Sequence, residues 1–232
     1  MLKTLSYLLI FSILLTLTCS FTNQKSESIQ EKILPVKISK SQGTKNTLIV
    51  YFSGDGGWNN FSLTLMAAFE KEGYGVVAFN SRKYFWTKKT PDIFAKEATQ
   101  LAAQYLKEWS KKNVVWVGYS FGADVAAFLP GRLSKEMATQ TERIILLSPS
   151  LSSDFVIRLT DLIGDSKNTK RKYKLGPEIN ASVIPVVCVF GRKEDLLLKN
   201  SLIKKETLTI LELPGGHQYN NDPASLVKLI GL

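Results

Sequence analysis

Hydrophobic runs and amphipathic stretches alternate along most of this chain. Short runs rich in β-branched and aromatic residues, typical of buried strands, lie at 48–53, 76–80, 114–117, 144–148, 183–190 and 207–213. Stretches typical of helices lie between and after them, at 62–71, 91–111, 121–129 and 222–230. The alternation predicts an α/β fold of three layers, with a mostly parallel central sheet and helices on both faces.

The start of the chain has a different pattern. Residues 1–18 carry a single charge, Lys3, and their apolar run is shorter than the ~20 residues needed to cross a bilayer, so they predict a secretory signal peptide. Cys19 stands where a bacterial lipoprotein signal places its lipidated cysteine, although 16–18 match that signal poorly, and lipidation stays open. Residues 19–32 predict a polar tether and 33–232 a single domain. We expect an exported protein, either periplasmic or anchored to a bacterial membrane as a lipoprotein.

The composition of the chain limits the classes of molecule that it is expected to bind. The 232 residues are 44% hydrophobic, enough for one sizeable core, and their net charge is +10. An exported protein rarely meets nucleic acid, so the charge indicates either an anionic membrane surface or plain solubility, and nucleic acid is not expected as a partner. Of the two cysteines, Cys188 lies in an apolar strand-like run, and no disulfide framework or cysteine-based metal site is expected.

The run 118–122, Gly-Tyr-Ser-Phe-Gly, carries the first sign of chemistry. In a Gly-x-Ser-x-Gly turn the serine sits on a sharp strand-to-helix bend, where larger flanking side chains would clash. Here a buried-strand pattern precedes Ser120 and a short apolar helix pattern follows it, which is the order this turn requires. A glycine-rich loop that merely contains a serine is the weaker interpretation, and Ser120 is predicted to be a nucleophile.

His217 is the only histidine of the chain and follows the last predicted strand in a Gly-Gly-His turn. A nucleophilic serine needs a base, and no other candidate base is present. His217 is therefore predicted to be that base rather than a surface histidine. With a single histidine and no carboxylate cluster, no metal site and no cofactor are expected.

Two adjacent carboxylates, Glu194 and Asp195, follow the strand-like run that ends at Phe190, where the acid of a triad is expected. Spacing from Gly191 favours Glu194, whereas the apolar residues that follow and the usual preference for aspartate favour Asp195. By a narrow margin, Asp195 is the predicted acid of the triad. The resulting order of serine, acid and histidine is that of the α/β-hydrolases, and the short interval after Ser148 leaves room for a small lid or none.

Acyl transfer also needs N–H donors for the oxyanion. In this fold one donor is the residue after the nucleophile, here Phe121. The other is expected from the glycine-rich loop after the strand at 48–53, where Gly54, Asp55 and Gly56 are the candidates. That loop lacks the lysine of a P-loop and the spacing of a dinucleotide-binding turn, so neither phosphate-binding motif is expected.

Four stretches together resemble the family of bacterial virulence proteins typified by VirJ and the C-terminal domain of AcvB. These stretches are 52–58 (Phe-Ser-Gly-Asp-Gly-Gly-Trp), 84–86 (Tyr-Phe-Trp) with Thr90-Pro91, 118–125 (Gly-Tyr-Ser-Phe-Gly-Ala-Asp-Val) and 215–217 (Gly-Gly-His). The resemblance implies a periplasmic α/β-hydrolase and, for AcvB-like members, hydrolysis of lysyl-phosphatidylglycerol. A membrane phospholipid or a small ester would then be the substrate.

The matched stretches also contain candidates for substrate binding. Asp55 and Asp124 are carboxylates that can meet a cationic aminoacyl group, and Trp58 and Tyr119 stand beside them in the sequence. Asp124 suits a structural role better, as a hydrogen-bond acceptor early in its helix. Two other functions remain open: a generic carboxylesterase or peptidase, and a non-catalytic binding protein of a secretion apparatus on the same fold.

Overall fold

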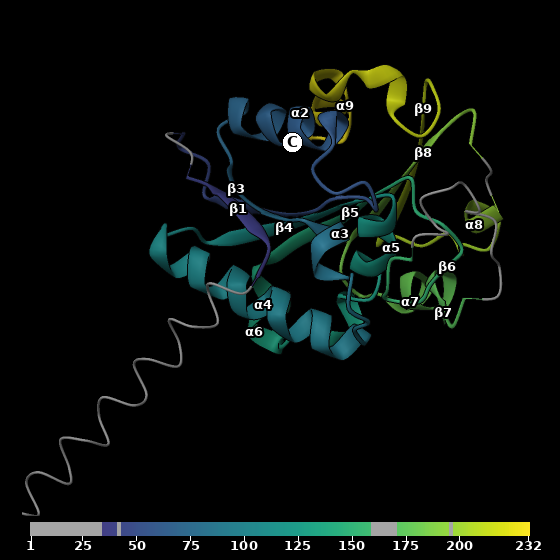
Figure 1. Cartoon of the computed structure of the whole chain (residues 1–232), viewed down its shortest axis with the longest axis horizontal. Coiled ribbons are helices and arrows are strands. Elements are labelled where there is room, and N and C mark those ends of the chain that lie inside the picture. The colour runs from purple at the N-terminus through teal and green to yellow at the C-terminus, as the bar shows by residue number, and fades with distance from the viewer. Residues whose placement is uncertain (1–33, 41–42, 159–170, 195–196) are drawn as a thin grey trace, which may run out of the picture. The chain divides into compact units, whose positions relative to one another are not determined.

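Seven strands form the central sheet of the computed structural model, which describes residues 34–40, 43–158, 171–194 and 197–232 (Figure 1). Their order across the sheet is β1-β3-β2-β4-β5-β8-β9. β1 runs antiparallel to β3, and the other neighbours are parallel. The strands are β1 (Val36–Ser39), β2 (Thr47–Phe52), β3 (Gly75–Phe79), β4 (Asn113–Tyr119), β5 (Thr141–Leu147), β8 (Val186–Gly191) and β9 (Leu208–Leu213).

Helices cover both faces of this sheet, which confirms the predicted α/β-hydrolase architecture. α2 (Asn60–Lys71) and α9 (Pro223–Leu229) lie on one face, and α4 (Pro91–Glu108) and α6 (Lys135–Gln140) lie on the other (Figure 1). The shorter helices are α3 (Ser81–Tyr84), α5 (Phe121–Ala126), α7 (Leu175–Ala181) and α8 (Leu197–Asn200).

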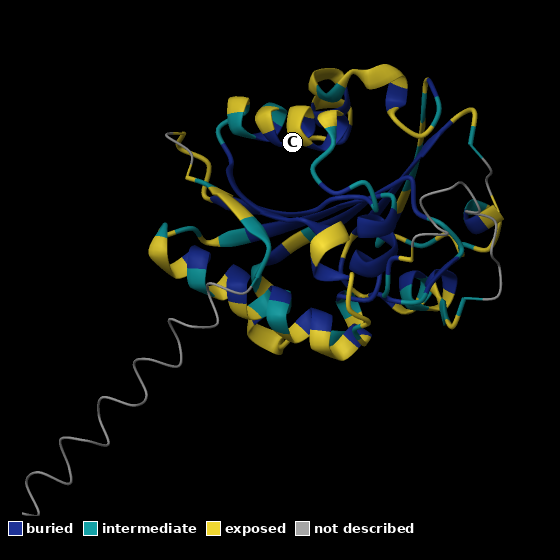
Figure 2. Cartoon of the chain, viewed as in Figure 1, coloured by how far each residue is buried: buried dark blue, intermediate teal, exposed yellow. Residues whose placement is uncertain are grey.

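The central strands are buried on both sides, as parallel strands between two helical layers must be. Every residue of β2, β3 and β8 is buried (Figure 2). On one side they pack against apolar side chains of α2 and α9, among them Leu65, Phe69 and Val227. On the other side aromatic rings form a continuous cluster in which Phe94 of α4 contacts Phe52 and Phe85.

α4 shows why the sequence forms its helices where it does. Thr90 caps the helix by accepting a hydrogen bond from the Ile93 N–H, and Pro91 occupies the first turn, where its missing N–H costs nothing. The residues facing the sheet recur at three- and four-residue spacing and include Phe94, Ala98 and Leu101. The predicted helix at 91–111 is therefore present, and it ends three residues earlier, at Glu108.

Some elements are absent from the sequence prediction or shifted from it. β1 is short and half-exposed, so its four residues show little hydrophobic pattern. The strand predicted at 183–190 begins at Val186, because Val183 is 85% exposed and Pro185 intervenes. The interval after β5 contains a small two-stranded sheet, β6 (Ser152–Ser153) paired with β7 (Tyr173–Lys174).

The compact unit that holds the sheet runs from Pro35 to Leu232. The signal peptide predicted at 1–18, the lipidation site at Cys19 and the tether at 19–32 lie outside the described residues. Within the described part of the chain, no helix has the length and apolar character needed to span a membrane.

Candidate active site

Ser120 stands on the sharp turn between β4 and α5, at the carboxyl end of a central strand. Its backbone has φ 53° and ψ −122°, a conformation that side-chain-bearing residues rarely adopt. The turn is held on both sides, because the Ser120 N–H donates to Leu147 O at 2.8 Å and the Ala123 N–H donates to Ser120 O at 2.8 Å. The strand-turn-helix order predicted from the sequence is therefore present.

The two glycines of the motif are needed for close packing. A Cβ atom at Gly118 would lie 2.4 Å from Gly122 O, and one at Gly122 would lie 2.1 Å from Phe52 O. Both distances are far below van der Waals contact. α5 therefore lies directly against the end of β2, which brings Ser120 to the edge of the sheet.

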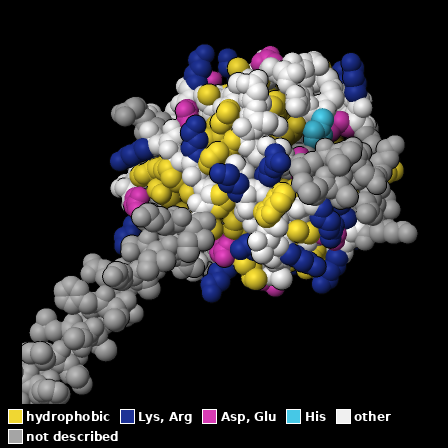
Figure 3. Space-filling model, viewed as in Figure 1, with side chains coloured by type: hydrophobic (Ala, Val, Ile, Leu, Met, Phe, Trp, Pro, Cys, Tyr) yellow, Lys and Arg dark blue, Asp and Glu magenta, His cyan; other side chains and the backbone are white. Residues whose placement is uncertain are grey.

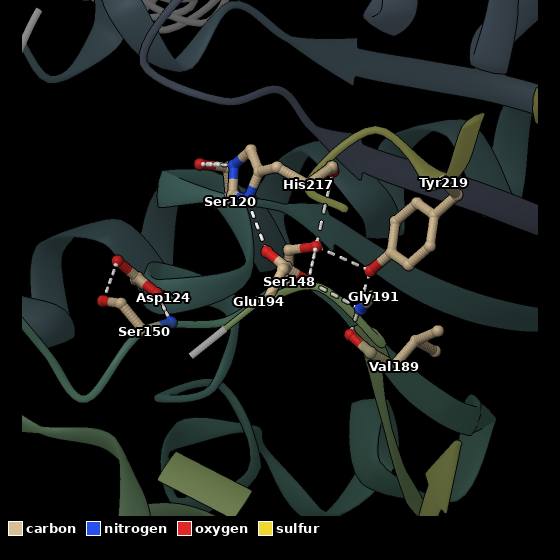
Figure 4. Close-up of polar contacts among 9 residues, drawn as sticks. All are labelled: Ser120, Asp124, Ser148, Ser150, Val189, Gly191, Glu194, His217 and Tyr219. Atoms are coloured by element: carbon tan, nitrogen blue, oxygen red, sulfur yellow. Dashed lines mark hydrogen bonds and ion pairs between the residues drawn. The ribbon is translucent and has the colours of Figure 1, made fainter. Parts of the chain in front are cut away.

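Three side chains from separate parts of the chain form a continuous hydrogen-bonded line (Figure 4). Ser120 Oγ lies 2.9 Å from His217 Nε2, and His217 Nδ1 lies 2.6 Å from Glu194 Oε1. With the proton on Nδ1, the imidazole donates to the carboxylate and accepts from the serine hydroxyl. This arrangement is chemically able to deprotonate Ser120 and to stabilise the imidazolium that results.

The carboxylate that contacts His217 is Glu194, whereas the sequence leaned to Asp195. Glu194 ends a tight turn after β8, and its N–H donates to Gly191 O at 2.9 Å. Gly191 itself packs against the histidine turn, since a Cβ atom there would lie 2.4 Å from Gly216 O. This close approach carries the residue three positions after Gly191 to His217. Asp195 lies outside the described residues, and on this geometry Glu194 replaces it as the candidate acid.

Glu194 is held as a carboxylate by three donors. Its Oε2 accepts from the Gly191 N–H at 2.6 Å and from Ser148 Oγ at 2.8 Å, while Oε1 faces His217. Burial by itself raises the pKa of this carboxyl group, but the hydrogen bonds from His217, Gly191 and Ser148 outweigh it and keep the pKa below its usual value. Glu194 therefore stays ionised and oriented.

Ser148 and Tyr219 support this carboxylate, and sequence analysis assigned them no role. Ser148 Oγ lies 2.7 Å from the Tyr219 hydroxyl, which is itself 2.9 Å from Val189 O (Figure 4). Ser148 follows the end of β5, the strand beside β4, and Tyr219 stands two residues after His217. Ser148 lies at the end of a predicted strand and Tyr219 lies close to His217, so the sequence contained a signal that both could belong to the site. Only the order of the strands in the sheet shows that the two side chains meet.

The candidate oxyanion donors lie at the same edge of the sheet as Ser120. A Cβ atom at Gly54 would lie 3.3 Å from Ser120 Cβ, so the loop after β2 reaches the nucleophile. Gly54 O accepts from the Gly57 N–H at 3.0 Å, which tightens the loop around Asp55 and Gly56. Among the residues that the structure describes, the N–H groups of Gly54 and Phe121 donate to no other group. Both remain able to bind an oxyanion.

Asp124 has a structural contact rather than an open carboxylate. It is buried in α5, where its Oδ1 accepts from the Ser150 N–H and its Oδ2 from Ser150 Oγ, each at 2.7 Å (Figure 4). Burial raises its pKa to about 7, and the two bonds from Ser150 partly offset that effect. Asp124 thereby ties the segment that contains Ser148 to the helix that begins beside Ser120.

The other three residues that the sequence suggested as substrate contacts differ in burial and in what they contact. Tyr119 is 3% exposed, and its ring packs between Phe61 and His217, so it forms a wall behind the imidazole. Asp55 is half-buried in the loop after β2, and Trp58 packs partly against the core while it also lines a pocket.

The described residues contain no group of three or more His, Cys, Asp or Glu side chains placed to hold a metal ion. Cys188 is buried in β8, as its apolar surroundings predict, and burial raises the pKa of its thiol to about 12. A buried thiol of this kind is a poor nucleophile.

Comparison with protein families confirms the resemblance drawn from the sequence. Residues 46–231 match the family described as bacterial virulence protein (VirJ). The chain belongs to the VirJ family. The match covers most of the chain and includes Ser120, Glu194 and His217. No curated protein matches the chain significantly.

Solved structures with the same fold include hydrolases. The esterase domain of a Rhodothermus marinus protein aligns with a TM-score of 0.58 and 12% identity over 85% of this chain and 90% of that one. Proline iminopeptidase of Mycobacterium smegmatis aligns with a TM-score of 0.57 and 11% identity over 84% and 92%. Est1E of Butyrivibrio proteoclasticus aligns with a TM-score of 0.54 and 14% identity over 84% and 89%. At such low identities these matches establish the α/β-hydrolase fold alone.

Proposed function

We propose that this VirJ-family protein is an exported serine hydrolase that cleaves an aminoacyl ester of phosphatidylglycerol, such as lysyl-phosphatidylglycerol. The observation that carries the catalytic part is the line of hydrogen bonds from Ser120 through His217 to Glu194, at 2.9 and 2.6 Å. Such a line is typical of an activated nucleophile with its base and orienting acid.

In the first half-reaction His217 Nε2 takes the proton of Ser120 Oγ as the oxygen attacks the ester carbonyl carbon. The oxyanion that forms would receive hydrogen bonds from the N–H groups of Phe121 and Gly54. The bond between the carbonyl carbon and the glycerol oxygen then breaks as His217 gives its proton to that oxygen, which leaves as a hydroxyl group, and the aminoacyl group remains on Ser120. Glu194 stays ionised throughout and stabilises the imidazolium.

In the second half-reaction a water molecule attacks the acyl-enzyme. His217 Nε2 accepts one proton of the water and returns it to Ser120 Oγ as the carbonyl group reforms. The free amino acid leaves, and the serine hydroxyl is restored. Each proton removed by His217 is returned by His217, so the cycle needs no cofactor.

The substrate assignment rests on two supports of different kinds. The first is membership of the VirJ family, whose resemblance at 52–58 and 118–125 implies an aminoacyl lipid for AcvB-like members. The second is the net charge of +10, which attracts an anionic membrane surface at about 1 kcal/mol for each lysine near that surface. A generic carboxylesterase or peptidase on the same site is the second candidate, because the fold is shared with esterases and an iminopeptidase.

Release of the amino acid from lipid vesicles tests this proposal. Purified protein is incubated with vesicles that contain lysyl-phosphatidylglycerol, and in parallel with a neutral short-chain ester of matched reactivity. We expect free lysine at a higher kcat/KM than for the neutral ester, and none with Ser120→Ala. Turnover of the neutral ester alone would indicate a generic esterase, and turnover of neither would indicate a binding protein.

We also propose that the enzyme works outside the cytoplasm, on the strength of the apolar, charge-poor segment at 1–18. The intact mass of protein extracted from membranes tests this proposal. A mature chain that begins at a lipid-modified Cys19 indicates an anchored lipoprotein, and cleavage elsewhere indicates a periplasmic protein. An uncleaved chain in the cytoplasm would contradict export.

A further inference from the structure

A pocket of about 640 Å³ is lined in part by the loop after β2, the loop in which Gly54 reaches Ser120 and which also contains Gly56. Its wall comes from two segments: the loop after β2, with Gly57 and Trp58, and the segment after β3, with Asn80, Arg82, Lys83 and Trp86. β2 lies between β3 and β4, and β4 leads into Ser120. The pocket is therefore on the side of the nucleophile opposite β5, β8 and the Glu194 turn.

The two segments that form the pocket are fixed to each other. Gly57 has φ +65°, and a Cβ atom there would lie 2.8 Å from Asn80 Oδ1, so the loop and the segment after β3 touch at this point. Asn80 Oδ1 accepts from the Lys83 N–H at 3.0 Å, and Asn80 N–H donates to Pro35 O at 2.8 Å. The pocket wall is thus built by specific contacts and is available before any ligand binds.

The charges at the pocket have one sign. Arg82 and Lys83 are both exposed, and neither forms an ion pair with any carboxylate among the residues that the structure describes. The indole of Trp86 is 52% exposed beside them, and Trp58 supplies a second aromatic surface. An anionic group attached to an apolar body complements such a lining.

The pocket also contains two tryptophans from the stretches that resemble the VirJ family, and neither belongs to the candidate triad. Trp58 belongs to the stretch 52–58 and Trp86 to the stretch 84–86, two of the four stretches by which the sequence resembles the VirJ family. Both line this pocket, although they are 28 residues apart in sequence. Figure 3 shows basic and hydrophobic side chains next to one another on the face that carries the histidine.

We propose that this pocket binds the phosphodiester group of a glycerophospholipid whose ester carbonyl lies at Ser120. The guanidinium of Arg82 presents paired N–H donors to phosphate oxygens, Lys83 adds a second positive charge, and the indoles contact the glycerol and the first acyl carbons. The leaving alcohol would then lie on the β3 side of Ser120. This inference rests on the proposed function for the position of the ester, but its binding step does not require catalysis.

A binding measurement on the Ser120→Ala protein separates the pocket from the chemistry. The probe is dihexanoyl-phosphatidylglycerol below its micelle concentration, followed by intrinsic tryptophan fluorescence, with Trp86→Phe to locate the signal. We expect Arg82→Ala/Lys83→Ala to weaken binding about tenfold. The control, Lys107→Ala/Lys112→Ala, removes the same charge at the other end of the sheet and is expected to change it less than twofold.

Equal affinity in the two double variants would overturn the proposal. Inorganic phosphate that binds as tightly as the lipid would also overturn it, because the site would then be a simple anion site. Substrate selectivity in the active enzyme is the second readout: the ratio of kcat/KM for an anionic lipid ester to that for a neutral ester is expected to fall about tenfold in Arg82→Ala/Lys83→Ala. If no ester is cleaved but the lipid still binds in this pocket, the proposed hydrolase function is wrong, whereas the assignment of the pocket as a phospholipid-binding site is supported.

Discussion

At the scale of single residues, the acid of the candidate triad is defined by what surrounds it. Glu194 accepts hydrogen bonds from His217, the Gly191 N–H and Ser148 Oγ, and each of these donors comes from a different segment. A carboxylate one position along the turn starts from a different Cα, so the three donors fix both the residue and its orientation.

Replacing Glu194 tests this assignment against its neighbour. Glu194→Gln is expected to lower kcat by about 10³–10⁴-fold, because an amide in place of the carboxylate cannot stabilise the imidazolium. Asp195→Asn, the matched change at the adjacent carboxylate, is expected to cost less than tenfold. Steady-state kinetics on one soluble ester measures both, and the reverse order would return the role to Asp195.

Asp124 gives a pH-dependent prediction on stability. Burial raises its pKa to about 7, whereas an aspartate in an unfolded chain has a pKa near ~3.9. The folded protein therefore keeps a proton that the unfolded chain loses, and this group lowers the free energy of unfolding as the pH rises from about 4 to about 7. Asp124→Asn imitates the protonated form and can keep both contacts with Ser150.

The stability advantage of Asp124→Asn over the wild type is expected to grow across that pH window and to level off above pH 7, at roughly 2–4 kcal/mol. Urea unfolding at several pH values measures it. Glu136→Gln, at an exposed carboxylate of α6, is the control. A difference between Asp124→Asn and the wild type that stays constant from pH 4 to pH 8 would show that Asp124 is ionised in the folded protein.

Local sequence identifies some site residues better than others. Ser120 and His217 stand in motifs whose glycines and flanking patterns are readable without a structure. The choice between Glu194 and Asp195 depends on how Gly191 packs against Gly216, a contact between segments 25 residues apart. Ser148 follows β5 and Tyr219 follows β9, and the two meet because β8 lies between these strands in the sheet. Such long-range contacts leave no local pattern.

At the scale of elements, the site depends on how closely α5 lies against β2. Gly122 is the contact point, because any side chain there would overlap the backbone of Phe52 and Ser53. The same approach brings the loop at Gly54 to within reach of Ser120. The helix that begins after the serine and the loop with a candidate oxyanion donor are therefore positioned together.

Gly122→Ala is expected to lower the free energy of unfolding by about 1–3 kcal/mol or more, because the added methyl group forces α5 away from β2. Activity is expected to fall as well, since the separation moves Ser120 from Gly54. Gly131→Ala is the control: its Cβ atom would lie 3.6 Å from the nearest atom, and its effect on stability is expected within ±0.5 kcal/mol. Urea denaturation compares the two, and equal stabilities would contradict the packing argument.

The elements that hydrophobic patterns predict are those with a long buried face. β2, β4 and α4 are recovered nearly to their ends, because the two strands form continuous buried apolar runs and the buried residues of α4 repeat with the helical period. α3 spans four residues and β6 and β7 two each, too few for a period to appear. Their presence follows from tertiary contacts such as the bond from the Tyr84 hydroxyl to Glu97.

At the scale of the whole molecule, the strand order brings the site together. Ser120 follows β4, Ser148 follows β5, Glu194 follows β8 and His217 follows β9, four strands that are neighbours in the sheet. Parallel strands end at one edge, so residues spread over 98 positions meet there. This is the usual place for a ligand in an open α/β sheet.

The excess positive charge gives a prediction that belongs to the molecule as a whole. Exposed charges are screened within ~8 Å at physiological ionic strength, so added salt is expected to lower the rate on anionic vesicles at least tenfold between about 50 mM and 500 mM. Hydrolysis of a soluble lysyl ester in the same series is expected to change less than twofold. Parallel salt dependence of the two rates would show that attraction to the membrane surface does not contribute.

The central claim is that Ser120 is an activated nucleophile. Labelling with a fluorophosphonate probe, followed by mass spectrometry of the digested protein, tests it most directly, because the probe reacts covalently only with a serine whose proton is removed by a neighbouring base. The account predicts a single adduct on Ser120 that is absent in Ser120→Ala and at least 100-fold slower to form in His217→Ala. A folded wild-type protein that forms no adduct, or forms it on another serine, would contradict the account.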